Sequence, residues 1–371
     1  MLKVLFIEDE PTSIETVIEE LEQKIKAIKC EVKKFRNAKA FIRSFSPDIV
    51  VLDIFRGSIQ ENETAGLRVY ESIWNERFCP IVIYSARPND ISDEVKEHPF
   101  IQLVQKGAGS EESVISHIES FLPHVEAIHE IQNNVRECMN RELKETAPRV
   151  FQAISDTDKR RDVFIRTSRR RIAAMMDQPP DEPIACWEQY LYPPVGSSLM
   201  TGDIIRKKTG DKNTPGNYFV VLTPSCDLVG SRARKPSVAS VLVAYCTQVE
   251  SVLRDAQVDR NTKMKRFKEK LLLVLTRGYG SLCLPLPELP GVFPYMTVEL
   301  KKLELINLKL IGKGTSCKYF RVASVDSPFR EMISWAYLQV TGRPGLPDRD
   351  LNDWADHIYR TVSQSDQGVD A

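Results

Sequence analysis

One apolar run that leads into an aspartate, IVVLDIF at residues 49–55, constrains the fold of this chain more than any other feature. Its first four residues are apolar, Asp53 follows directly, and the sequence turns polar soon afterwards. This pattern is typical of a buried parallel strand that delivers a carboxylate to the carboxyl edge of its sheet. Ligands of open α/β sheets bind at that edge, so the run predicts a functional carboxylate at Asp53.

Strand-like and helical patterns alternate through residues 1–122. Five short apolar runs lie at 3–7, 30–32, 49–53, 81–84 and 101–104. The segments between them have apolar residues at helical spacing. Crossovers between parallel strands are right-handed and must cover the sheet. This order therefore predicts a five-stranded, doubly wound parallel sheet with helices on both faces.

Polar residues follow four of these predicted strands, and parallel strands bring such residues to one edge. They are Glu8 and Asp9 after the first strand, Asp53 in the third, Ser85 after the fourth and Lys106 after the fifth. Clustered carboxylates repel one another unless a hard cation is present, which favours Mg²⁺. One carboxylate can then attack a phosphoryl group, while the metal and an ammonium neutralise the phosphoryl oxygens. The alternative is that these residues are solvated loop side chains.

The motifs IEDEP at 7–11, VLD at 51–53, IYSA at 83–86 and QKG at 105–107 resemble the receiver domain of two-component response regulators. The resemblance covers about the first 122 residues and implies a flavodoxin-like fold. It also implies phosphorylation by a sensor histidine kinase in the presence of Mg²⁺. Carried over by position, Asp53 is the phosphoacceptor, and the metal ligands are Glu8, Asp9, Asp53 and the carbonyl of Phe55. The phosphate-binding and switch residues are Ser85, Ala86 and Lys106.

Two positions depart from the pattern of that family. Gly107 stands where family members usually have proline, and Leu103 where they have the switch aromatic. Phe100 and Tyr84 are the candidate substitutes for that aromatic. These departures leave phosphorylation intact but put in doubt how the receiver signals to the rest of the chain.

A long apolar stripe follows the receiver region. Its members recur mostly every three or four positions, as in an amphipathic helix or short coiled coil; they are Val114, Ile118, Phe121, Val125, Ile128, Ile131, Val135, Met139, Leu143, Val150 and Ile154. Pro123 either opens a new helix or kinks a continuous one. The stripe favours a homodimer paired through residues 111–154, and the alternative is a helix docked on its own chain.

The sequence predicts three parts, namely a receiver at 1–122, a helical connector at 123–178 and an output region at 179–371. Basic runs lie at 159–171 and 263–270. They contact nucleic-acid phosphates or else form solvated helix faces. For the run at 159–171 the second reading is favoured, because 51 basic and 51 acidic residues leave the whole chain neutral.

The output region, 179–371, is predicted to be β-rich with C-terminal helices, plausibly a small barrel or strongly bent sheet. One of its predicted strands is LLLVL at 271–275. TPSCDL at 223–228 follows a strand and offers Cys226 and Asp227; a cysteine nucleophile needs a base, and His357 is the only histidine after residue 129. A turn with a buried thiol is the favoured reading of this motif. The segments around 202–204 and 223–224 also faintly resemble the barrel core of toxin endoribonucleases.

Neither a membrane span nor a disulfide framework is predicted. No stretch approaches the ~18–20 consecutive apolar residues of a spanning helix, and the eight cysteines include no C-x-x-C pair. The sequence thus predicts a cytoplasmic response regulator whose output region is a binding or interaction module. The alternative is a receiver-gated effector enzyme, for example a nuclease.

Overall fold

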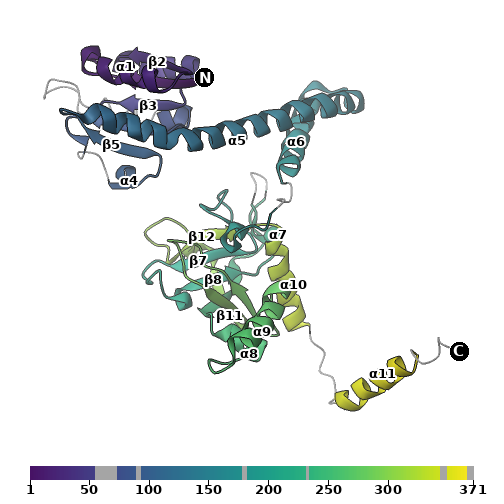
Figure 1. The fold of residues 1–371 in the computed structure, drawn as a ribbon. Coiled ribbons are helices and arrows are strands. Elements are labelled where there is room, and N and C mark those ends of the chain that lie inside the picture. Colours follow the sequence, from purple (N-terminus) through teal and green to yellow (C-terminus); the bar gives the residue numbers. More distant parts are fainter. Residues whose placement is uncertain (55–72, 89–92, 178–181, 231–233, 343–348, 366–371) are drawn as a thin grey trace. The chain divides into compact units, whose positions relative to one another are not determined.

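The computed structural model describes residues 1–54, 73–88, 93–177, 182–230, 234–342 and 349–365. The chain forms two compact units, Met1–Pro179 and Pro180–Ala371. Figure 1 shows the helices and strands of both units. Within the described residues, no helix has both the length and the apolar character that a membrane crossing requires.

The first unit is built on a five-stranded parallel sheet with the strand order β2-β1-β3-β4-β5. Its strands are β1 (Leu2–Ile7), β2 (Ile28–Lys33), β3 (Ile49–Leu52), β4 (Ile81–Ser85) and β5 (Ile101–Gln105). Its helices are α1 (Glu15–Lys24), α2 (Phe35–Phe45), α4 (Asp93–Lys96), α5 (Ser110–Ala153) and α6 (Thr157–Met176). The predicted doubly wound α/β fold is confirmed, and this strand order is that of flavodoxin and CheY.

Two apolar layers cover the sheet. Helices α1 and α5 pack on one face, with Val17 and Ile118 in the core, and α2 packs on the other face with Ile42 in the core. Strand β3 lies at the centre, and its four residues are at most 2% exposed. Because both faces are covered, the central strands are continuously apolar, which is why the run at 49–52 could be recognised from sequence.

Helix α5 continues far beyond the sheet (Figure 1) and is one helix of 44 residues with Pro123 and Pro148 inside it. Pro123 therefore does not open a separate helix. Helix α6 folds back along the end of α5. A buried carboxylate joins the two helices, because Glu142 is fully buried and pairs with Arg171 at 2.6 Å.

The second unit contains a seven-stranded sheet, all of whose pairings are antiparallel, in the order β10-β11-β9-β8-β7-β12-β6. The strands are β6 (Tyr190–Leu191), β7 (Asp203–Lys207), β8 (Tyr218–Val221), β9 (Ser240–Gln248), β10 (Cys283–Leu286), β11 (Met296–Asn307) and β12 (Tyr319–Val325). The helices are α7 (Ser225–Leu228), α8 (Ser251–Ala256), α9 (Met264–Arg277), α10 (Phe329–Thr341) and α11 (Leu351–Ser365).

This sheet is strongly curved. Tyr190 on one edge strand donates its hydroxyl hydrogen to the Pro287 carbonyl, just past the opposite edge strand, at 2.9 Å. Its ring also meets Phe293 edge-on at 5.2 Å between centroids. The prediction of a β-rich unit is confirmed. The predicted strand at 271–275 is wrong, because these residues form the last turns of α9.

Candidate functional site

The carboxyl edge of the parallel sheet gathers four of the five polar residues singled out in the sequence. Glu8 directly follows β1, Asp53 follows β3, Ser85 ends β4, and Lys106 comes one residue after β5. Glu8, Asp53 and Ser85 are 5%, 8% and 0% exposed. Three polar side chains are thus held in a largely desolvated position, which is costly unless each finds a partner.

Lys106 is the cation that pairs with both carboxylates. Its Nζ donates to Glu8 Oε2 at 2.5 Å and to Asp53 Oδ2 at 2.7 Å. Burial by itself lowers the pKa of Lys106, but the hydrogen bonds to Asp53 and Glu8 outweigh burial and leave this pKa raised. The ammonium therefore stays charged at neutral pH, next to the carboxylate of Asp53.

Ser85 contributes a buried hydroxyl at the same edge. Its Oγ has no hydrogen-bond partner among the described residues. Leaving a buried polar group unpaired costs roughly 1–3 kcal/mol, so such positions call for an explanation. A hydroxyl at this edge is available to donate to an oxygen that arrives with a ligand.

The other positions implied by the resemblance are less closely joined to this group. Asp9 is half-buried, and its Oδ1 accepts a hydrogen bond from the backbone N–H of Phe35 at 3.3 Å. Ala86 is exposed at the edge, and its carbonyl accepts from Gln105 at 3.5 Å. Phe55, whose carbonyl was expected to bind the metal, lies outside the described residues.

The donors at this edge suit a hard divalent cation, because Glu8, Asp9 and Asp53 offer carboxylate oxygens and no soft ligand. In the described part of the chain, no three acidic, histidine or cysteine side chains are grouped closely enough to hold an ion. Lys106 contacts Glu8 and Asp53 at once, so a divalent cation would compete with its ammonium for the same two carboxylates.

Tyr84, rather than Leu103, provides the aromatic ring next to Lys106. Tyr84 is 4% exposed, and Lys106 Nζ lies 5.5 Å from its ring centroid. Its hydroxyl shares a hydrogen with Ser110 Oγ at 2.8 Å, and Ser110 in turn donates to the Gly107 carbonyl at 2.7 Å. Leu103 packs instead with the core on the α2 face. The sequence had offered Tyr84 as a substitute, but nothing in it singled out Ser110.

The candidate residues of the second unit do not form a described site. Cys226 is exposed on the short helix α7, and Asp227 accepts from the Ser237 hydroxyl at 2.8 Å. His357 is exposed on α11. Among the described contacts, none joins Cys226 to His357.

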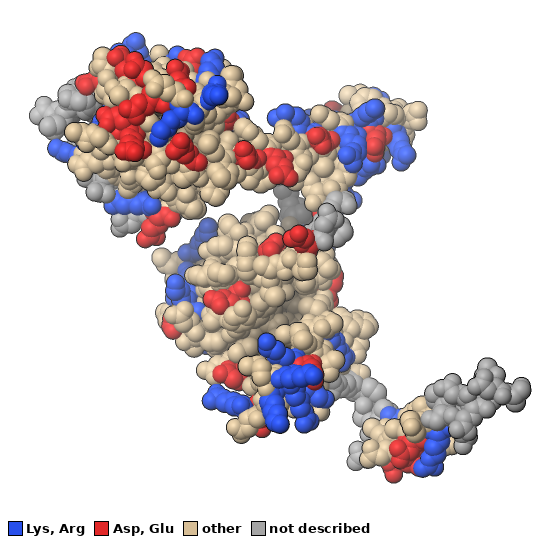
Figure 2. Space-filling view, viewed as in Figure 1, with Lys and Arg blue, Asp and Glu red and all other residues tan. Residues whose placement is uncertain are grey.

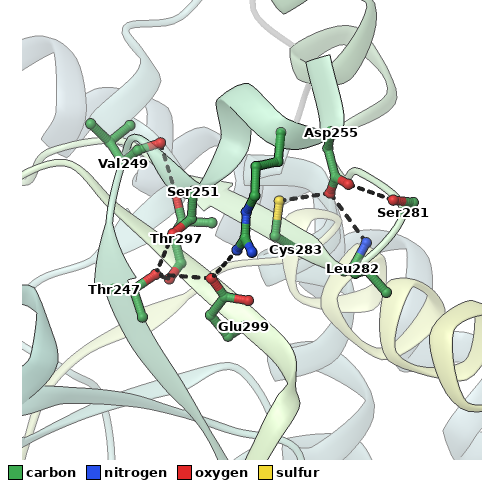
Figure 3. A network of polar contacts seen from close by, with 10 residues as sticks. Thr247, Val249, Ser251, Asp255, Ser281, Leu282, Cys283, Thr297 and Glu299 are labelled. Carbon is green, nitrogen blue, oxygen red and sulfur yellow. Dashed lines mark hydrogen bonds and ion pairs between the residues drawn. The ribbon is translucent and has the colours of Figure 1, made fainter. Parts of the chain in front are cut away.

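A second cysteine of this unit is held protonated inside a polar network (Figure 3). Cys283 donates its thiol hydrogen to Asp255 Oδ2 at 2.9 Å, and the same oxygen accepts from the Leu282 N–H at 3.1 Å. Burial, and then the bond to Asp255, raises the pKa of Cys283 far above its usual range. A thiol with such a pKa is no nucleophile at neutral pH, so this network braces α8 against β10.

The two basic runs differ in what their side chains do. Arg160 donates to the Ile154 carbonyl and lies over the Phe151 ring, and Arg171 pairs with Glu142 and Glu145. The run at 159–171 thus helps to hold the α5–α6 hairpin. The five cations of 263–270 make no ion pair among the described residues, and they belong to the basic cluster over α8 and α9 in Figure 2.

No family model matches the chain, and no curated protein matches it. Among solved structures it is similar to the N-terminal domain of a response regulator/sensory box/GGDEF protein from Carboxydothermus hydrogenoformans. The two are 22% identical over 34% of this chain and 97% of that chain, with a TM-score of 0.28. A CheY-like receiver domain from Methylobacillus flagellatus shares 18% identity over 34% of this chain and 98% of its own, with a TM-score of 0.26.

The Mn²⁺-bound form of response regulator Rcp1 shares 17% identity over 33% of this chain and 94% of its own, with a TM-score of 0.24. These matches extend over about a third of the chain and assign nothing to the second unit. The first unit has the flavodoxin-like fold, as its strand order β2-β1-β3-β4-β5 shows.

Proposed function

We propose that this protein is a two-component response regulator that accepts a phosphoryl group on Asp53 from a sensor histidine kinase. One observation carries the proposal, namely the Lys106 ammonium shared by Asp53 and Glu8 at the edge where the Ser85 hydroxyl has no partner within the described part of the chain. A nucleophilic carboxylate, a cation and a free hydroxyl donor are the groups that phosphoryl transfer to a side chain requires.

In the proposed reaction, an oxygen of Asp53 attacks phosphorus as the bond to the phosphohistidine nitrogen of the kinase breaks, and the imidazole leaves with the bonding electron pair. Lys106 turns from the carboxylates toward the new phosphoryl oxygens, and Ser85 donates its hydroxyl hydrogen to one of them. Glu8, Asp9 and Asp53 would hold Mg²⁺, which neutralises charge on the transferring group. The product is an acyl phosphate on Asp53, whose dianionic phosphoryl group replaces the single charge of the carboxylate and therefore adds about one negative charge at this edge.

Incubation with acetyl phosphate and Mg²⁺ tests this assignment. We expect near-stoichiometric incorporation of phosphate in the native chain and none in Asp53→Asn, measured by intact mass. Glu10→Gln is the matched control, because Glu10 is an exposed acid at the same edge, and it should be labelled like the native chain. Equal labelling of the native chain and Asp53→Asn would end the proposal.

We further propose that α5 pairs with α5 of a second copy. Val114, Ile118 and Val125 are buried in the receiver core, but the stripe then becomes exposed. Ile131, Val135, Met139 and Leu143 are 61%, 39%, 42% and 38% exposed and recur every four residues. A second copy is the natural cover for such a seam. The molar mass in solution, measured before and after treatment with acetyl phosphate, tests this pairing. A monomer under both conditions would rule out the proposed dimer.

The second unit is proposed to be a binding module, and α9 is its best-supported contact surface for a polyanion. Residues 263–277 contain a single acid, Glu269, against five cations at 263–270 for which the described residues show no ion pair. We expect Lys265→Gln/Lys268→Gln to lower affinity for single-stranded RNA and to reduce the salt dependence of binding by about two phosphate contacts. Arg169→Gln/Arg170→Gln removes the same charge from the other run, and an equal effect there would count against α9.

A further inference from the structure

A second buried carboxylate, Asp48, lies at the amino edge of the same sheet, where strand β3 begins. Its side chain is 5% exposed. Oδ2 accepts the backbone N–H of Lys3 at 2.9 Å, and the Asp48 N–H donates to the Lys3 carbonyl at 2.8 Å. Oδ1 faces an imidazole and a guanidinium, since it lies 2.7 Å from His129 Nε2 and 3.7 Å from Arg77 Nη2. Asp48, Arg77 and His129 are called the Asp48 latch below.

Two members of the latch mark the ends of the segment that contains Asp53. From Asp48 the chain runs through β3 to Asp53, and it comes back to the latch at Arg77, directly after the helical residues 73–76. Arg77 Nε also donates to the Pro47 carbonyl at 2.9 Å. A displacement of β3 therefore changes the position of Asp48 relative to Arg77.

The third member, His129, lies where α5 leaves the receiver. Val125 is the last α5 residue in the receiver core, at 5% exposed. Val125, Ile128 and His129 line one side of a small pocket beside Asp48 and Arg77. The next member of the apolar stripe, Ile131, is 61% exposed. His129 thus contacts Asp48 where α5 leaves the receiver core.

We propose that the Asp48 latch is the point at which the state of Asp53 reaches α5. This inference rests on the proposed phosphorylation of Asp53. The four residues of β3 between Asp48 and Asp53 are almost wholly buried and closely packed, so the strand transmits small shifts rather than absorbing them. The new charge at Asp53 changes its contact with Lys106 and displaces β3. Asp48 then shifts against Arg77 and His129, so the contact between Asp48 and α5 changes.

This route needs neither a proline after Lys106 nor an aromatic side chain at Leu103. Gly107 and Leu103 depart from the usual family pattern on the β5 side of the sheet. Asp48, in contrast, directly precedes β3, the strand that leads to Asp53. The latch also acts on the part of α5 that leads directly into the exposed stripe at 131–143. A change at His129 therefore reorients the surface through which two copies are proposed to pair.

The test is His129→Ala in the full chain, with His117→Ala as the matched control on the same helix. His117 lies twelve residues earlier, where α5 is already packed on the sheet, and its imidazole makes no described contact with Asp48. Amide hydrogen exchange at 126–135 is measured with and without acetyl phosphate and Mg²⁺. Alanine is the better helix former, so helix propensity alone would slow exchange in the variant.

We expect exchange at 126–135 to be about tenfold faster in unmodified His129→Ala than in the native chain, because a hydrogen bond to a buried charge is lost. In the native chain acetyl phosphate should change this exchange, and in His129→Ala it should have no further effect although Asp53 is labelled normally. Normal labelling with a native-like response in His129→Ala would overturn the latch alone. Absence of labelling in the native chain would overturn both the relay and the phosphoacceptor assignment.

Discussion

Replacing Lys106 by methionine should lower the free energy of unfolding of the first unit by about 2–3 kcal/mol at pH 7. The variant keeps the bulk of the lysine stem but leaves Glu8 and Asp53, whose side chains are 6% and 9% exposed, without their shared cation. Breaking a buried ion pair typically costs about 3–5 kcal/mol. The Lys106 side chain is 21% exposed, so solvent screening places the expected loss at the lower end.

The dependence on pH identifies the cause. The pKa of Lys106 is raised in the folded chain, so its contribution is fully present below the unfolded value of about 10.4 and is lost as pH rises through the folded value. The native chain should therefore lose stability in strongly alkaline solution, and Lys106→Met should not show this additional loss.

Denaturant-dependent hydrogen exchange in β1 and β3 measures this loss in the first unit alone, which matters because a two-unit chain need not unfold in one step. Lys33→Met is the matched control. Lys33 pairs with Glu31 at 3.2 Å on the open surface of β2, and such pairs contribute at most about 1 kcal/mol. A loss in Lys106→Met no larger than that in Lys33→Met would show that the two carboxylates do not depend on Lys106.

The receiver fold and its polar edge could be predicted because each signal is local. A run of four apolar residues before Asp53 marks a strand covered on both faces, and the strand ends place Glu8, Ser85 and Lys106 at one edge. Strand alternation then fixes the class of sheet. Placing the site required no knowledge of contacts between distant residues, because the topology itself brings the strand ends together.

The LLLVL segment was misread because a short apolar run has no period that separates a buried strand from a helix. In the structure it belongs to α9, where Val274 is buried while Leu272 and Leu273 are 56% and 67% exposed. The helix begins at Met264, so the preceding basic residues belong to the same element. The basic run at 263–270 and the apolar run at 271–275 together are longer than a typical strand, and this combined length would have indicated a helix.

Other features depend on contacts that no local pattern reveals. Asp48 and His129 are 81 positions apart, and both look like ordinary surface residues in the sequence. Arg160 and Arg171 read as part of a basic run, yet they support the α5–α6 hairpin through Phe151 and Glu142. The sequence shows how many basic residues a run contains but not which groups they contact. Only the structure therefore shows that the two basic runs differ in the partners of their side chains.

In the second unit, the largest effect is expected from Arg321→Met, which should destabilise that unit by about 3–4 kcal/mol at pH 7. Arg321 Nη1 lies 3.2 Å from Asp203 Oδ2, and the Asp203 side chain is only 1% exposed. The same guanidinium donates to the carbonyls of Val195, Gly196 and Ser198. Its removal leaves a buried carboxylate without a counter-charge and three carbonyls without a donor.

Acid should reduce this deficit. Burial raises the pKa of Asp203, and hydrogen bonds from Ser324 and the Met200 N–H, together with Arg321, only partly oppose burial. A raised pKa means that the folded unit favours the protonated acid. The stability contribution of Asp203 is therefore greatest at low pH and declines as pH rises from the unfolded value of about 3.9 through the folded value. Without Arg321 the decline should be larger and extend to higher pH.

The double variant Asp203→Asn/Arg321→Met separates the buried charge from the loss of the loop carbonyl contacts. Asparagine keeps one acceptor oxygen for the Met200 N–H, and its amide NH₂ can donate to the Ser324 hydroxyl. It carries no charge, so the double variant should recover most of the loss at pH 7 and lose the added pH dependence. Any loss of stability that remains in the double variant measures the contribution of the hydrogen bonds from Arg321 to the carbonyls of residues 195–198. Hydrogen exchange in β7 and β12 is the measurement. If the single and double variants are equally unstable at every pH, Arg321 acts by fastening that loop and not by neutralising Asp203.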